Sequence, residues 1–124
     1  MEKERVNQWI ANILSSLYEN FPKRIILIPS QIDKNADLQT QMAISDLIIW
    51  LSEERIIRFQ ERDISGNFLN CTLTMKGFMI LNQIPQALEE NTTLGEKLSK
   101  ILKEGSINAL NQTVNLLIQK FIGG

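Results

Sequence analysis

Apolar residues near the start of the chain recur at steps of three and four, which is the spacing of one face of an α-helix. The stripe consists of Val6, Ile10, Ile13, Leu14, Leu17 and Phe21, with Trp9 beside it. We predict a helix over residues 3–20, because a residue before proline disfavours the helical conformation and Phe21 precedes Pro22. The β-branched run at 25–28, closed by Pro29, predicts a short strand.

A second amphipathic helix is predicted in the middle of the chain. Residues 29–36 are mostly turn and cap formers, so they predict an irregular link or a single helical turn. Asp37 is placed to cap a helix that ends near Glu54. We expect its buried stripe on Leu38, Met42, Leu47, Ile48 and Leu51, while Ile44, Ile49 and Trp50 widen the apolar surface of the helix.

Strict alternation of apolar and polar residues then predicts an antiparallel hairpin over residues 57–73, with turn residues at 63–67. A period of two places a set of apolar side chains on one face of the hairpin, packed on the helices. This set is Ile57, Phe59, Leu69, Cys71 and Leu73. Cys71 is therefore expected to be an inert core residue.

Three helices are predicted after the hairpin. Thr74 is placed to cap the first, which Pro85 ends, and a polar link follows at 89–92. Residues 93–96 read Thr-Leu-Gly-Glu, a capping box that begins a helix ending at Gly105. The last helix starts at Ser106.

The last helix carries an apolar seam typical of helix-to-helix packing. Its residues are Ile107, Leu110, Val114, Leu117 and Phe121. We divide the chain into a mixed domain at 1–86 and a helical extension at 87–124, which packs on the core or on a second subunit. We favour a homodimer through this seam over packing within the chain, and over a membrane surface, because the last helix carries too little positive charge for anionic lipid.

Composition narrows the possible functions. The chain has 124 residues, 13 basic and 14 acidic side chains, one cysteine and no histidine. Histidine-based triads, dyads and metal sites are therefore excluded, and one cysteine cannot make an internal disulfide or a CxxC pair. Without a glycine-rich phosphate loop either, we expect no catalytic, cofactor or metal residues and no enzyme. The first residues lack the apolar stretch of a signal peptide and no run is long enough to span a membrane, so we expect a cytoplasmic protein.

Two segments resemble the winged-helix fold, whose order is helix, short strand, helix, two-stranded wing and helix. Residues 50–57, Trp-Leu-Ser-Glu-Glu-Arg-Ile-Ile, look like a recognition helix running into the first wing strand, with Arg55 where glycine is usual. Residues 73–77, Leu-Thr-Met-Lys-Gly, resemble the sequence that leaves the wing in MarR- and PadR-type repressors of bacteria and phages. The expected fold is thus an α+β, winged-helix-like domain with two C-terminal helices.

This resemblance implies a DNA-binding transcription regulator. Residues of about 39–45 in the predicted middle helix would then enter the major groove, and the wing would contact phosphates. The candidate DNA-binding residues are Gln39, Thr40, Gln41 and Ser45 on the helix, with Arg58 and Arg62 on the wing.

The charge balance favours a different function. Residues 1–86 hold nine basic and ten acidic side chains, whereas DNA-binding domains are usually basic. The alternative is a protein-interaction module with the same fold, with an exposed apolar patch around Ile44, Ile49 and Phe68. We place DNA binding first because of the signature at 73–77, and the interaction module second.

Overall fold

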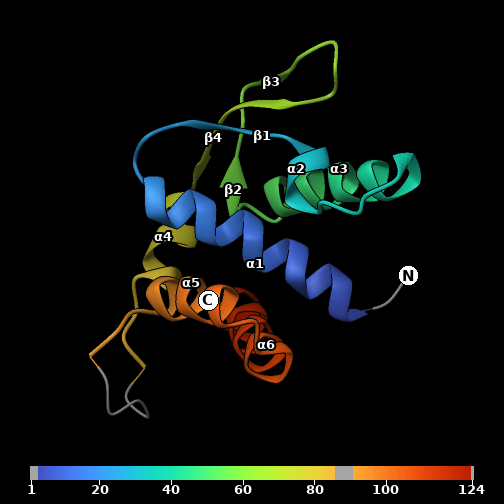
Figure 1. The fold of residues 1–124 in the computed structure, drawn as a ribbon. Helices are drawn as coiled ribbons and strands as arrows, with labels where there is room; N and C mark the ends of the chain where they lie inside the picture. The colour runs from blue at the N-terminus through green and yellow to red at the C-terminus, as the bar shows by residue number, and fades with distance from the viewer. Residues whose placement is uncertain (1–2, 86–90, 124) are drawn as a thin grey trace.

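The computed structural model describes residues 3–85 and 91–123, which form an α+β structure with six helices and a small antiparallel sheet of four strands (Figure 1). The helices are α1 (Lys3–Asn20), α2 (Pro29–Ile32), α3 (Leu38–Glu53), α4 (Met75–Leu81), α5 (Leu94–Glu104) and α6 (Ile107–Gly123). The strands are β1 (Ile25–Leu27), β2 (Ile57–Arg58), β3 (Glu61–Arg62) and β4 (Phe68–Leu73). The predicted boundary between residues 86 and 87, and the acidic residues of the predicted link at 89–90, lie outside the described residues.

Helix α1 is the element around which the others pack. Figure 1 shows it crossing the molecule, with the sheet, α2 and α3 on one side and α5 and α6 on the other. Its predicted stripe is confirmed, since Ile13 and Leu14 are fully buried and Leu17 is nearly so. Trp9 is also buried, and its indole Nε1 donates a hydrogen bond to Asp33 Oδ2 at 2.9 Å.

Strand β4 is the centre of the sheet, and it contains a bulge. It pairs with β1 on one side and with β2 and β3 on the other. Between the pairs Ile25 with Cys71 and Leu27 with Phe68, β1 advances two residues while β4 advances three. Asn70 takes a left-handed φ of 56° at this point, as bulge residues often do.

The bulge corrects one prediction about the hairpin. Simple alternation placed Leu69 in the core and left Phe68 exposed, but Phe68 is fully buried and Leu69 only partly. The extra residue at Asn70 resets the alternation, so Phe68 and Cys71 face inward together. Cys71 is buried as predicted, and burial raises the pKa of its thiol to about 11.

Helix α3 has its predicted length, but its buried face differs from the predicted one. The buried residues are Thr40, Ile44, Ile48 and Leu51. They are spaced by four, four and three residues and so form one face of the helix. Leu38 and Met42 were predicted to be core residues, but they lie away from this face and are 72% and 62% exposed. Trp50 is 44% exposed, so it is only partly packed.

The backbone at the end of α3 shows what the residue at position 55 does, where Arg55 stands in place of the glycine that is usual in winged-helix proteins. The backbone N–H of Ile56 donates to the Leu51 carbonyl oxygen at 3.1 Å, and that of Arg55 donates to Ser52 at 3.0 Å. These two bonds form a Schellman motif, which needs a left-handed residue after the helix. Arg55 is that residue, with a φ of 62°.

The start of α4 is bonded to the segment that enters the hairpin. The backbone N–H of Thr74 donates to the Ile56 carbonyl oxygen at 3.0 Å, and its hydroxyl donates to the Arg55 carbonyl oxygen at 2.6 Å. The same hydroxyl caps α4 as predicted, accepting from the Gly77 N–H at 3.1 Å. Gly77 is buried, and a Cβ there would overlap the Ile56 carbonyl oxygen. The signature at 73–77 therefore has a structural role at this junction.

The C-terminal helices pack against α1 of the same chain. Thr93 begins α5 with the predicted capping box, and Gly105 ends it in the left-handed conformation. Four seam residues of α6, Leu110, Val114, Leu117 and Phe121, belong to the same hydrophobic core as α1. The described part of the extension thus packs within the chain.

We expect Gly77→Ala to lower the free energy of unfolding by about 1 to 3 kcal/mol, because the new methyl group displaces α4 from Ile56. The matched control is Gly123→Ala, where the added Cβ meets no heavy atom within 4 Å apart from its chain neighbours and the backbone of its own helix. Urea unfolding of both variants measures the difference. Equal stability of the Gly77 variant and the wild type would contradict this account of the junction.

We expect Arg55→Gly to raise the free energy of unfolding by about 0.5 to 1 kcal/mol, because glycine adopts a left-handed φ without strain. The control, Arg58→Gly, places glycine in a strand and should lower it by a similar amount. Thermal unfolding followed by circular dichroism tests both. Destabilisation by Arg55→Gly would show that the arginine side chain outweighs the backbone strain.

Candidate functional site

The exposed face of α3 is apolar and acidic. Its exposed residues are Leu38, Gln39, Met42, Asp46, Trp50 and Glu53. The last five are spaced by three or four residues, so they form one stripe opposite the buried face, and Leu38 lies beside its N-terminal end. No residue of α3 is basic. We call these six residues the α3 face.

The structure places the four predicted base-contacting residues of α3 in different environments. Gln39 is exposed, whereas Thr40 is 5% exposed because it belongs to the buried face. Gln41 is partly buried and its side-chain Nε2 donates to the Ala36 carbonyl oxygen at 3.1 Å. Ser45 Oγ donates to the Gln41 carbonyl oxygen at 3.0 Å. Thr40 is therefore buried within the chain, and Gln41 and Ser45 have hydrogen-bond partners within the helix region.

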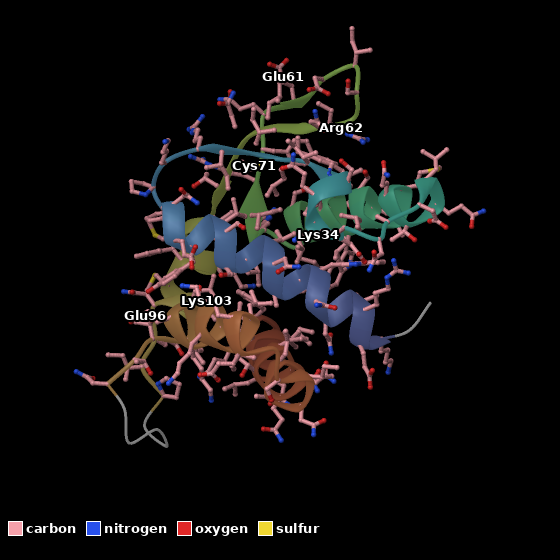
Figure 2. The ribbon with its side chains drawn as sticks, in the orientation of Figure 1. Lys34, Glu61, Arg62, Cys71, Glu96 and Lys103 are labelled. Atoms are coloured by element: carbon pink, nitrogen blue, oxygen red, sulfur yellow. The ribbon has the colours of Figure 1, made fainter. Side chains whose placement is uncertain are left out.

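The two predicted wing arginines also differ. Arg58 is exposed on β2. The guanidinium of Arg62 donates to the Gly66 carbonyl oxygen at 3.1 Å, and its Cζ lies 4.4 Å from the centre of the Phe68 ring. Figure 2 shows Arg62 on the hairpin, on the side of α2 and α3. Arg62 is thus held against its own hairpin by a hydrogen bond and a cation–π contact.

Carboxylates lie at the start of α3 and at the hairpin turn, the two elements that the resemblance predicts to contact DNA. Asp37 caps α3 by accepting from the Thr40 N–H at 2.8 Å, and hydrogen bonding from Thr40 lowers the pKa of this carboxyl. At the hairpin turn, Asp63 accepts from the Asn67 N–H at 2.9 Å, which lowers its pKa in the same way. Both groups are anionic at neutral pH and repel phosphate.

The residues predicted to form the seam of a homodimer are largely covered by their own chain. Leu110, Val114, Leu117 and Phe121 are at most 7% exposed, and only Ile107, at 60%, is exposed. Helices α1, α4 and α5 of the same chain contact α6. These four side chains are therefore not presented to a second copy.

The predicted apolar interaction patch is wrong, and a different one replaces it. Ile44 and Phe68 are fully buried and Ile49 is partly buried. The exposed apolar side chains of α3 are instead Leu38, Met42 and Trp50. Sequence reasoning missed them because it treated all apolar positions of the helix as one broad stripe. The spacing of Thr40, Ile44, Ile48 and Leu51 was the available signal, although it requires a threonine in the core.

Neither metal-binding clusters nor membrane-spanning helices occur in the described parts of the chain. No group of three or more cysteine, aspartate or glutamate residues within 3–85 and 91–123 could hold a metal ion. Across these ranges, no helix is both long enough and apolar enough to cross a membrane.

Comparison of the chain with protein-family models, with curated proteins and with solved structures found no match.

Proposed function

We propose that this protein is a non-enzymatic protein-interaction module, built on a winged-helix-like arrangement, that binds its partner through the α3 face. The order α1, β1, α2, α3, hairpin and α4 is compatible with that arrangement. In it, α3 occupies the place of the recognition helix. The proposal therefore takes the second of the two functions that the sequence suggests.

The observation that carries the proposal is the chemistry of the α3 face. Binding to DNA derives most of its affinity from phosphates neutralised by lysine and arginine. The α3 face offers two carboxylates, Asp46 and Glu53, and no cation. A helix with this surface would repel the DNA backbone at the position where a DNA-binding protein must attract phosphates.

The same chemistry suits a protein partner with apolar and basic side chains. Leu38, Met42 and Trp50 extend over about 18 Å of helix at 1.5 Å per residue. Tryptophan and methionine are enriched in protein interfaces, and tryptophan is often a residue that dominates binding energy. Asp46 and Glu53 beside them are complementary to lysine or arginine on the partner.

A photo-crosslinking amino acid in place of Met42 tests the proposal in cells of the organism that encodes the chain. We expect a discrete protein adduct that nuclease treatment does not change. Because like charges repel, Asp46→Lys with Glu53→Lys should reduce its yield by about tenfold. The same probe in place of Gln112, an exposed residue of α6, is the matched control and should give no such adduct.

Three results would contradict the proposal. One is the lack of an adduct at position 42, or equal adducts at positions 42 and 112. Another is an adduct that contains nucleic acid. The last is binding of the wild-type chain to random duplex DNA that falls steeply with salt and is lost in Arg58→Ala with Arg62→Ala, which would restore the DNA-binding function.

A further inference from the structure

A groove runs beside the edge of the sheet, away from the residues of the α3 face. Its volume is about 700 Å³, and residues of α1, β1, α2 and α5 line it. Its lining includes residues 25–28 and, from α1, the polar residues Gln8, Asn12 and Ser16. Leu102 of α5 also lines the groove. A neighbouring hollow of about 560 Å³ shares Gln8, Asp33, Asn35 and Leu102 with it.

Strand β1 has one unpaired edge. In the described residues it lies at the end of the sheet order and pairs only with β4. The N–H and C=O groups on the opposite edge of such a strand can accept another strand. Residues 25–28 include no charge that would block such pairing, and Ile26 is 55% exposed. The Ile28 carbonyl oxygen already accepts from the N–H groups of Gln31 and Ile32, so the free edge is that of Ile25–Leu27, which spans about 10 Å at 3.3 Å per residue.

The end of the groove near α2 is held rigidly. Asp33 Oδ2 accepts hydrogen bonds from Arg5 Nε and from Trp9 Nε1, both at 2.9 Å. Asn12 Nδ2 donates to the Ile32 carbonyl oxygen at 3.0 Å. These bonds tie the segment after β1 to α1. The groove is therefore formed before any ligand arrives, which lowers the entropy cost of binding.

Positive charge lies at both ends of the free edge. Lys23 and Arg24 immediately precede β1 and are exposed. Lys34 lines the other end of the groove, and Figure 2 shows it on the opposite side of α1 from Lys103 of α5. The acidic residue beside it, Asp33, already forms an ion pair with Arg5 at 2.9 Å. The charge offered to a ligand is thus positive.

We propose that the groove binds an extended acidic peptide, which adds a strand to the free edge of β1 and places carboxylates near Lys23, Arg24 and Lys34. Its main chain would bond to residues 25–27, as in other cases of strand addition. A second copy of this chain is a poorer occupant. Antiparallel pairing of two β1 edges would bring Lys23 and Arg24 of one copy toward Lys34 of the other, and like charges across strands destabilise pairing. The α3 face plays no part in this site.

The test uses a fluorescein-labelled peptide, Glu-Asp-Thr-Val-Thr-Val-Asp-Glu, and fluorescence anisotropy. Its four central residues favour an extended strand and its ends carry the matching charge. Two further versions are N-methylated at alternate central residues, one at the odd and one at the even positions. Because alternate N–H groups of a strand point to opposite edges, one methylated version should lose binding by at least about tenfold and the other should keep it.

The charge requirement is tested on both partners. A peptide with lysine in place of every acidic residue should bind at least about tenfold more weakly. Lys34→Glu should weaken binding of the acidic peptide, while the matched control Lys103→Glu should leave it unchanged. Lys103 is exposed on α5 and does not line the groove.

The proposal is overturned if the acidic peptide shows no saturable binding up to about 1 mM. It is also overturned if both methylated peptides bind as well as the parent, since binding would then not depend on hydrogen bonds from the main chain of the peptide. Tighter binding of a fluorescein-labelled oligothymidine than of the peptide, with the same loss in Lys34→Glu, would assign the groove to single-stranded nucleic acid instead. None of these outcomes depends on the α3 face, so they are distinct from a failure of the proposed function.

Discussion

The close approach of α4 to the Ile56 carbonyl group is the contact on which the rest of the structure depends. Thr74 bonds to Arg55 and Ile56 through both its hydroxyl and its backbone N–H, and Gly77 allows the helix to lie against them. These residues connect the entry of the hairpin to its exit. The junction therefore fixes the end of α3, the register of β2 on β4 and the start of α4 together.

This junction also explains how much of the fold was predictable. Thr74, Asp37 and Thr93 cap their helices as predicted, because capping depends on neighbouring residues alone. The bulge at Asn70 and the phase of α3 depend on contacts between distant segments, and sequence periodicity did not detect them. The residues that suggested a winged-helix repressor are used to build the junction, so they support a fold more directly than they support DNA binding.

The candidate sites were less predictable than the fold. The charge balance of residues 1–86 indicated that DNA binding lacked its usual basic surface, but not which side chains would be exposed instead. Which side chains of α3 are exposed depends on how the helix is rotated about its axis. In the structure this rotation turns Met42, Asp46 and Trp50 outward. The groove beside β1 could not be foreseen at all, because α1, the edge strand and α5 meet there only in the folded chain. Together the two proposals describe a module with an acidic, apolar face and a separate groove of positive charge.

Native-state amide hydrogen exchange at the junction tests the central claim most directly. If the junction holds the fold together, the amides of Thr74 and Gly77 should exchange only through global unfolding, with the same free energy as the core amides of α1 such as that of Leu14. Exchange of Thr74 and Gly77 through local opening, at a free energy well below that of Leu14, would show that α4 is peripheral and would contradict the account.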